Sequence, residues 1–190
     1  MDAFDYAVNT TLDLEGGYSD VQGDRGGRTN FGITERTFRD ALEQAVIFGV
    51  SDIKDLTLAQ AKAIYKVRYW FPLRLGDVCD ARIAAEIFDT AVNSGTGRAA
   101  LIAQLALEYL GETLTLDGVI GPATISLINK WCVKDPRALM VCLNGFQFIH
   151  YVAIVNEDLL GEIAKRVKSD PGQVAFARGW TKRIQEYRRV

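Results

Sequence analysis

The stretch Glu15-Gly16-Gly17-Tyr18-Ser19-Asp20 decides how the front of this sequence is interpreted. Before it, residues suited to a buried stripe recur with the 3.6-residue period of a helix. The stripe consists of Phe4, Ala7, Val8, Thr11 and Leu12. Two glycines then allow the chain to turn sharply. We therefore expect a helix over residues 2–14 that ends at Glu15.

Glu15 falls on the same stripe, because it follows Phe4 by almost three whole helical turns. An ionised carboxylate is costly on a face that points into the protein, and the helix dipole at that end disfavours negative charge. Both effects raise the pKa of a carboxyl group. The alternative is a structural glutamate whose stem packs while its head reaches solvent.

The residues after Glu15 are polar and rich in glycine. Residues 16–33 lack helical period and suit loops with a short, irregular β-hairpin. They supply a second carboxylate, Asp24, and a protonated acid beside a second carboxylate is the equipment of glycoside hydrolysis. We predict that Glu15 is a general acid and that Asp24 holds water or stabilises an oxocarbenium-like sugar. Asp24 in a simple turn is the alternative, and Thr29 and Asn30 either position water or bond backbone groups.

The rest of the chain reads as a series of helices. Thr34 is a plausible N-cap, and Thr57 with Gln60 fits a capping box for a helix that runs to about Tyr69. The other expected helices are the one after Thr34, with Phe38, Ala41, Leu42, Ala45 and Val46 on one face, then residues 81–93 and 98–110, two that begin at Pro122 and Pro136, and a last one after Pro171.

The break Ser94-Gly95-Thr96-Gly97 predicts two parts, residues 1–95 and 96–190, packed on each other. The run Ala138–Val155 is apolar nearly all round, so we expect it to be the buried centre of the second part. It is short for a membrane span and contains polar residues, including His150, which favours a core helix over membrane insertion.

Composition excludes several classes of protein. A net charge of -2 gives no global basic field for nucleic acid. Cys79, Cys132 and Cys142 have irregular spacing and form no CxxC pair, so reduced, buried thiols are expected and neither a metal nor another cofactor is implied. The first ten residues lack the basic and apolar regions of a signal peptide, which predicts synthesis in the cytoplasm.

The segment Glu15–Thr34, E-G-G-Y-S-D-V-Q-G-D-R-G-G-R-T-N-F-G-I-T, resembles the signature of glycoside hydrolase family 108. That family comprises the N-acetylmuramidases of prophage endolysins and their bacterial relatives. The spacing matches without a gap, and the chain departs from the pattern at Val21-Gln22. Residues 69–72 and 88–95 also resemble the family. Residues 117–124, D-G-V-I-G-P-A-T, and the late Gly179-Trp180 resemble its usual partner, a helical peptidoglycan-binding domain.

The resemblance implies a mainly α, lysozyme-like fold, with a small β-hairpin after the first helix and a helical C-terminal part. It implies a bacteriolytic hydrolase that cleaves the β-1,4 bond between N-acetylmuramic acid and N-acetylglucosamine, with Glu15 as the acid. Peptidoglycan strands would be the partner, and release to the cell wall would need a holin-like pore or cell lysis. The rival hypothesis is a non-catalytic wall-binding or secretion-accessory protein.

Six further residues are candidates for substrate binding. Tyr69 and Trp70 either pack in the core or offer aromatic faces to sugar rings. Asp89 and Asn93, four apart on one helix, either bond to each other or hold sugar hydroxyls and N-acetyl groups. The remaining two candidates are Tyr18 and Arg28. The D-G-V-I-G motif is a turn that begins a helix or, alternatively, a wall-binding element.

Overall fold

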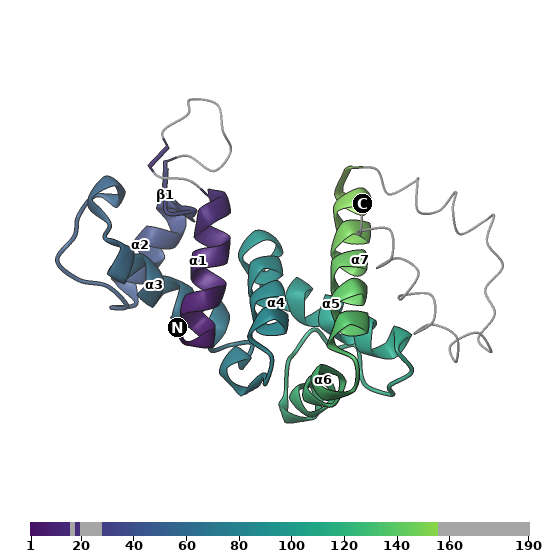
Figure 1. The fold of residues 1–190 in the computed structure, drawn as a ribbon. Coiled ribbons are helices and arrows are strands. Elements are labelled where there is room, and N and C mark those ends of the chain that lie inside the picture. The colour runs from purple at the N-terminus through teal and green to yellow at the C-terminus, as the bar shows by residue number, and fades with distance from the viewer. Residues whose placement is uncertain (16–17, 20–27, 156–190) are drawn as a thin grey trace.

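The structure is a computed structural model in which residues 1–15, 18–19 and 28–155 are described. Helices make up most of it (Figure 1). They are α1 (Ala3–Glu15), α2 (Glu35–Glu43), α3 (Leu58–Tyr65), α4 (Ala81–Ser94), α5 (Thr96–Tyr109), α6 (Pro122–Lys134) and α7 (Pro136–Val155). Strands β1 (Thr29–Asn30) and β2 (Ile33–Thr34) form one antiparallel hairpin. Short helical turns are η1 (Ile53–Asp55), η2 (Lys66–Trp70) and η3 (Leu75–Asp77).

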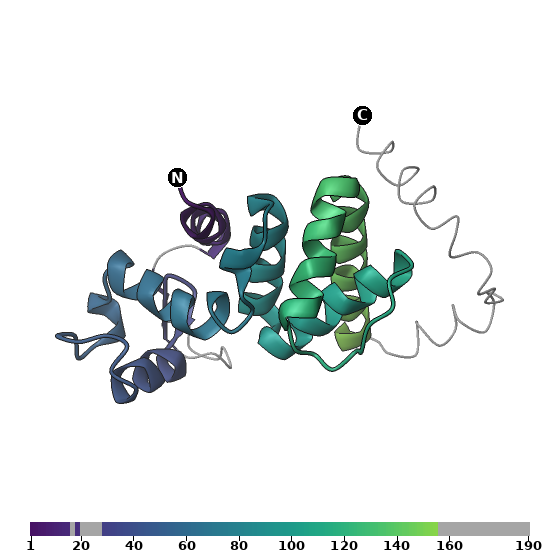
Figure 2. The same cartoon turned by 90° about the horizontal axis from the view of Figure 1, so that it is seen from below.

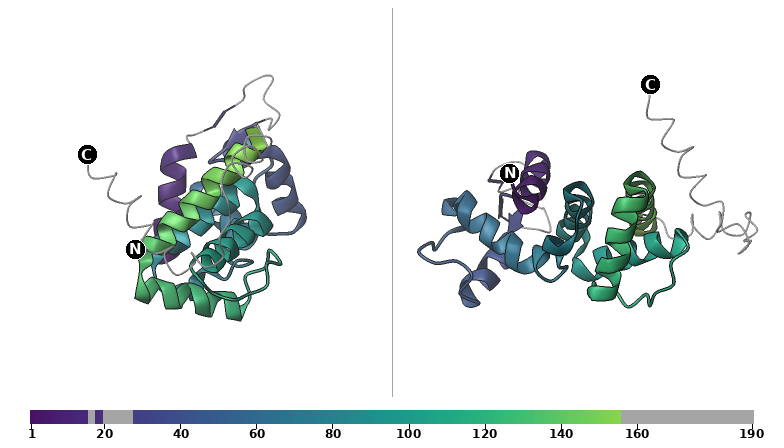
Figure 3. Two further views of the ribbon diagram at one scale, coloured as in Figure 1. Left: turned by 90° about the vertical axis from the view of Figure 1, so that its right-hand side faces the viewer. Right: turned by 60° about the horizontal axis from the view of Figure 1, so that its bottom comes forward.

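Helix α4 stands in the middle of the molecule. Helices α1, α2 and α3 and the hairpin lie on one side of it, and α5, α6 and α7 lie on the other (Figures 1 and 2). Helices α1, α4 and α7 rise in the same direction, so their C-terminal ends share the upper side of Figure 1. Figure 3 shows the same row of helices from two further directions. This arrangement puts the end of α1 on the same side of the molecule as the ends of α4 and α7.

An aromatic cluster joins α1 to α4. The ring of Phe88, fully buried on α4, meets Phe4 of α1 and Trp70 of η2 edge-on, with centroids 6.2 and 6.0 Å away. Tyr65 and Tyr69 complete the cluster at 5.8 and 6.4 Å from Phe88. Edge-to-face pairs at these separations add to the stabilisation that burial alone supplies. The cluster therefore fixes how α1 lies against α4.

The hairpin is closed by a two-residue turn. Asn30 pairs with Ile33, and the residues between them, Phe31 and Gly32, have φ of 50° and 70°. Two positive φ values in succession fit a type I′ turn, which matches the twist of paired strands. The left-handed conformation is costly for Phe31, and the Tyr65 hydroxyl donates to its carbonyl oxygen at 2.6 Å. The tip of the hairpin is thereby tied to α3.

Most helix starts agree with the sequence. The Thr34 side chain caps α2, Thr57 and Gln60 form the capping box of α3, and Pro122 is the first residue of α6. Helix α2 is shorter than predicted. It ends at Glu43, because Ala45 adopts a φ of 55°, which a helix cannot contain, so Ala45 does not extend the buried face.

Helix α7 differs from its prediction as the buried centre of the second part. Its buried residues are confined to the first half, whereas Phe148 and Ile154 are 67% and 68% exposed. The reason is that, within the described residues, its neighbours α4, α5 and α6 leave part of the surface of α7 uncovered. With a mean hydropathy of 1.7, α7 is long and apolar enough to cross a membrane. Core helices of soluble proteins meet the same two criteria. The helix expected after Pro171 lies outside the described residues.

The buried apolar residues form one continuous cluster, from Phe4 to Leu143. It includes side chains from both sides of α4, so the two predicted parts share a core within the described residues. Helices α4 and α5 meet at Gly95, whose φ of 86° suits glycine. We therefore expect the chain to unfold cooperatively.

Replacing Phe88 by Ala is expected to lower the free energy of unfolding by about 3–5 kcal/mol. Urea unfolding followed by tryptophan fluorescence and circular dichroism should show a single transition, shifted to lower urea. Phe48→Ala is the matched control, because that side chain is 72% exposed and should cost little. Two separate transitions, or equal effects of the two substitutions, would contradict a core shared through α4.

Candidate active site

The end of α1 that carries Glu15 lies beside α4. Thr11, one turn before Glu15, is 1% exposed, and its hydroxyl donates to Oδ1 of Asp89 on α4 at 3.4 Å. Glu15 is the last residue of α1, and the two glycines after it lie outside the described residues. The Thr11–Asp89 contact therefore places the last turn of α1 next to the C-terminal half of α4.

A pair of backbone hydrogen bonds closes the segment that carries Asp24. Ser19 and Thr29 exchange N–H to carbonyl bonds of 2.9 Å in each direction. Ser19 is four residues after Glu15, so the Ser19–Thr29 pair lies near the end of α1. Asp24 itself lies outside the described residues, and its role stays a prediction. What the structure provides is the pairing of Ser19 with Thr29, on either side of Asp24 in the sequence.

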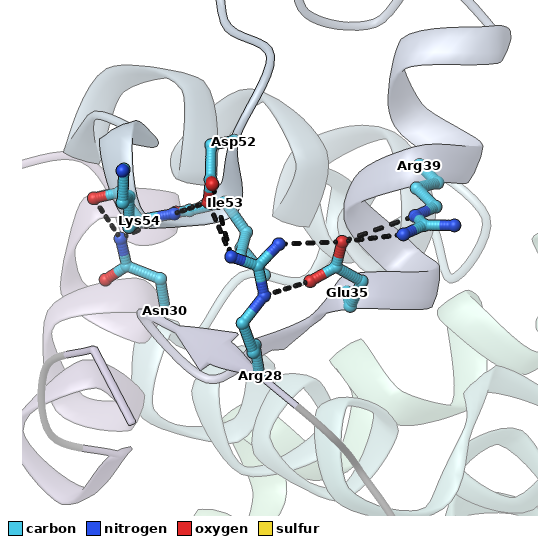
Figure 4. A network of polar contacts seen from close by, with 7 residues as sticks. All are labelled: Arg28, Asn30, Glu35, Arg39, Asp52, Ile53 and Lys54. Atoms are coloured by element: carbon cyan, nitrogen blue, oxygen red, sulfur yellow. Dashed lines mark hydrogen bonds and ion pairs between the residues drawn. The ribbon is translucent and has the colours of Figure 1, made fainter. Parts of the chain in front are cut away.

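Arg28 fixes that pair to the rest of the first part (Figure 4). Its guanidinium donates from Nε and Nη2 to the carboxylate of Glu35 at 2.8 and 3.1 Å, and from Nη1 to Asp52 at 3.0 Å. Glu35 begins α2 and also accepts from Arg39 at 3.0 Å. The side chain of Tyr18, which is 45% exposed, lies near enough to contribute to the raised pKa of Arg28, after Glu35 and Asp52. One arginine thus joins the end of the closed loop to α2 and to the residue before η1.

The network is held by opposite charges. The hydrogen bond from Arg28 is the main cause that lowers the pKa of Glu35. The backbone N–H of Lys54, followed by Arg28, lowers the pKa of Asp52, and both carboxylates together raise the pKa of Arg28. All these groups are ionised at neutral pH. The contacts give Arg28 a positioning role that the sequence did not indicate, because it was a candidate for substrate binding.

Asn30 and Thr29 have different surroundings. Asn30 is 5% exposed, and its Nδ2 donates to the carbonyl oxygens of Ile53 and Lys54 at 2.9 and 3.2 Å (Figure 4). Of the two alternatives for Asn30, the structure shows the backbone-bonding one. Thr29 is half-buried in the hairpin beside Ser19. Thr29 is therefore the residue of this pair that stays a candidate to position water.

Asp89 and Asn93 bond to each other. Asn93 Nδ2 donates to the Asp89 carbonyl at 3.0 Å and to its carboxylate at 3.3 Å. Tyr151 of α7 lies close by, since the charge of Asp89 acts on its hydroxyl group. Burial and then Asp89 raise the pKa of Tyr151. The sequence did not indicate Tyr151, because no local pattern shows that α7 returns to α4.

Tyr69 and Trp70 belong to the aromatic cluster. Trp70 is 4% exposed and packs on Phe4 and Phe88, so the structure shows the core alternative for this residue and offers no free face to a sugar. Tyr69 is half-buried against Tyr65, and burial raises its pKa. Both residues support the α1–α4 contact.

The D-G-V-I-G motif forms a turn held from inside. Gln104, 1% exposed, donates from Nε2 to Asp117 at 2.7 Å and accepts from the Gly118 N–H at 2.9 Å. Gly118 has a φ of 70°, and an added Cβ would lie 3.2 Å from the carbonyl oxygen of Gly97. Aspartate and glycine are therefore needed here by the turn itself, as the structural alternative predicts.

A hollow of about 500 Å³ lies next to this turn, at the junction of α4 and α5. Its walls are Ser94, Gly97, Arg98, Leu101, Leu116, Asp117 and Gly118. Arg98 is exposed, and no carboxylate among the described residues pairs with it. The pKa of His150 is lowered by its own burial and, to a smaller extent, by the charge of Arg98. Across the described residues, no three acidic, cysteine or histidine side chains converge as metal ligands.

Comparisons with known proteins agree with this geometry. Residues 4–95 match the sequence model of glycosyl hydrolase 108, and residues 98–185 match that of a predicted peptidoglycan domain. The structure of SagA from Brucella abortus aligns with a TM-score of 0.62 and 26% identity, over 96% of this chain and 90% of that one. No curated protein matches the chain.

The fold is lysozyme-like, and the molecule is a peptidoglycan hydrolase of the lysozyme type. More specifically, its residues 4–95 belong to glycosyl hydrolase family 108, followed by a peptidoglycan-binding domain. The two matched ranges meet at the junction of α4 and α5.

The Arg28 network predicts a particular acid sensitivity. Glu35 and Asp52 have folded-state pKa values below their ordinary 4.5 and 3.8, so their stabilisation is present above those values and is lost as pH falls through the folded pKa. Melting temperatures should fall as the pH drops below about 4.5. Arg28→Ala should melt lower at neutral pH and show a flatter fall in acid, because the carboxylates have lost their cation.

Arg39→Ala is the control for this measurement, since the Arg39 side chain is 70% exposed and bonds only Glu35 in the network. It should keep nearly the whole acid dependence. Identical pH profiles for wild type and Arg28→Ala would contradict the assigned role of Arg28.

Proposed function

We propose that this protein is an N-acetylmuramidase that hydrolyses the β-1,4 bond between N-acetylmuramic acid and N-acetylglucosamine. The observation that carries the proposal is the position of Glu15 in the matched hydrolase region, at the end of a helix packed beside α4. The Ser19–Thr29 pair supports it further, because it joins the two residues that enclose the segment with the second carboxylate, Asp24.

In the proposed reaction Glu15 is the general acid. It gives its proton to the glycosidic oxygen as the bond from that oxygen to the anomeric carbon of N-acetylmuramic acid breaks. Asp24 stabilises the positive charge on the sugar ring or holds the water that attacks it, and Thr29 helps to position this water. Water supplies a hydroxyl to the anomeric carbon, and its remaining proton restores Glu15 at the end of the cycle.

Polar side chains on the other helices supply a surface for the sugars. Asp89, Asn93 and Tyr151 come from α4 and α7 and lie on the side where α1 ends. We assign them to the hydroxyl and N-acetyl groups of the bound strand. Tyr18, exposed and close to Arg28, would be a further contact for the strand.

The hollow beside the D-G-V-I-G turn is the proposed contact of the second part with peptidoglycan. Arg98 offers a cation to a carboxylate of a stem peptide, and Leu101 and Leu116 offer an apolar wall to its aliphatic side chains. Ser94 links the hollow to the polar surface, since it lines the hollow and directly follows Asn93 at the end of α4. The same strand would then contact both parts of the protein.

The cellular role that fits this activity is that of a prophage endolysin. We propose synthesis in the bacterial cytoplasm, release through a holin-like membrane pore, and lysis of the wall from inside. The support is the match between residues 15–34 and the family signature. A holin-like gene next to this one would favour the role, whereas a secretion operon would favour the accessory-protein alternative.

Glu15→Gln is expected to lower the rate of peptidoglycan hydrolysis by about 10²–10⁴-fold, because it keeps the shape and removes the transferable proton. The measurement is turbidity loss of outer-membrane-permeabilised cells, with dye release from purified peptidoglycan as a second readout. Thermal stability should hold or rise, since a costly acid has gone.

Glu43→Gln is the matched control, because Glu43 also ends a helix and is exposed. It should leave activity unchanged. Near-wild-type turnover by a folded Glu15→Gln variant would remove Glu15 from its role. Asp24→Asn, assayed beside it, should lower turnover with little change in substrate affinity, because a second carboxylate acts mainly in the transition state.

Arg98→Ala is expected to raise KM for peptidoglycan by roughly 10-fold at unchanged kcat, because one charge-assisted hydrogen bond is lost. Arg36→Ala, an exposed arginine on α2, makes the same charge change away from the hollow and should have no effect. A fall in kcat at constant KM, or equal behaviour of the two variants, would contradict binding in the hollow.

A further inference from the structure

The loop before α4 is clamped to α6. Cys79 donates its backbone N–H to Oδ1 of Asn129 at 2.8 Å, and Asn129 Nδ2 donates to the carbonyl oxygen of Asp77 at 2.8 Å. The Cys79 thiol lies 3.9 Å from the Asn129 carbonyl oxygen. Cys79 is exposed, contrary to the expectation of buried thiols, whereas Cys132 and Cys142 are buried.

Cys132 lies one turn after Asn129 on the same face of α6. The Cys79 thiol, 3.9 Å from the Asn129 carbonyl oxygen, therefore lies on the side of α6 that carries Cys132, and after burial it is the next cause that raises the pKa of the Cys132 thiol. Two thiols that are 53 positions apart in the chain therefore lie close together in the fold. Cys142 is on α7, and burial raises the pKa of its thiol.

We propose that Cys79 and Cys132 form a reversible disulfide that joins the loop at the start of α4 to α6 when the protein meets a disulfide oxidant. The oxidant is a low-molecular-weight disulfide or a protein disulfide donor of the cell envelope. The disulfide depends on the proposed function in one respect: a protein that acts on the cell wall leaves the reducing cytoplasm and meets the oxidant there.

The surroundings of the two thiols set the order of the steps. Burial, followed by the neighbouring Cys79, raises the pKa of Cys132 to about 12, so Cys132 is a poor nucleophile. Cys79 is exposed, and its thiolate attacks the oxidant, forming a mixed disulfide and releasing one thiol. Cys132 then loses its proton and attacks the Cys79 sulfur, which closes the bond and releases the second thiol. The oxidant gains two electrons and two protons, and the protein loses them.

The bond would cross-link the two parts of the chain. Cys79 lies in the region matched to the hydrolase, and Cys132 lies in the predicted peptidoglycan domain. A disulfide that closes a loop of about 50 residues restricts the unfolded chain strongly. Oxidation should therefore stabilise the contact of α6 with the base of α4, on which the shared core depends.

The experiment uses the full-length protein, purified in reductant and then incubated with oxidised or reduced glutathione. Mass spectrometry of the oxidised sample should show loss of two hydrogen atoms, and non-reducing peptide mapping should link Cys79 to Cys132. The melting temperature should rise by roughly 5–15 °C on oxidation and return with dithiothreitol.

Three serine variants separate the steps. Cys142→Ser should oxidise like the wild type, and Cys79→Ser should neither form the bond nor change its melting temperature on oxidation. Cys132→Ser should stop at the mixed disulfide and gain one glutathione on Cys79. A linkage through Cys142, an oxidised protein with no Cys79–Cys132 peptide, or a melting temperature that falls on oxidation would overturn the proposal. None of these readouts uses peptidoglycan, so their failure leaves the proposed hydrolase untouched.

Discussion

The packing of α1 against α4 is the contact on which the candidate site depends. Near the start of α1, Phe4 meets Phe88 and Trp70 edge-on, and near its end Thr11 bonds Asp89. These contacts define both the position and the direction of the helix, so the turn that ends at Glu15 has a fixed place beside α4. Because α4 also packs on α5 and α7, the same helix carries the second part of the molecule.

A second set of contacts fixes the residues on either side of the segment that carries Asp24. Ser19 and Thr29 are joined by two backbone hydrogen bonds, and Arg28 binds the carboxylates of Glu35 and Asp52. Asn30 anchors the hairpin to η1 through the backbone carbonyls of Ile53 and Lys54. A hydrolase needs such an anchor, because a carboxylate on a loose loop does not hold water or charge at a fixed distance from the acid.

Local signals in the sequence predicted much of the fold, and long-range contacts account for what it missed. Thr34, Thr57 and Pro122 begin helices through their own neighbours, so their roles are visible in the chain. The partners of Arg28, Glu35 and Asp52, come from separate elements, and no spacing marks them. Tyr151 joins the polar surface only because α7 returns to α4. The exposed side of α7 was mispredicted for a related reason, since hydropathy does not tell how many neighbours a helix has.

The proposed activity is hydrolysis of the bond that follows N-acetylmuramic acid, and the ends of the product strands test it most directly. Purified peptidoglycan can be digested to completion with the full chain and the products reduced with borohydride, so that each new reducing end becomes a sugar alcohol. Mass spectrometry should then find the alcohol of N-acetylmuramic acid as the only new end. New ends made of reduced N-acetylglucosamine, or cyclic anhydro ends that form without water, would contradict hydrolysis after N-acetylmuramic acid.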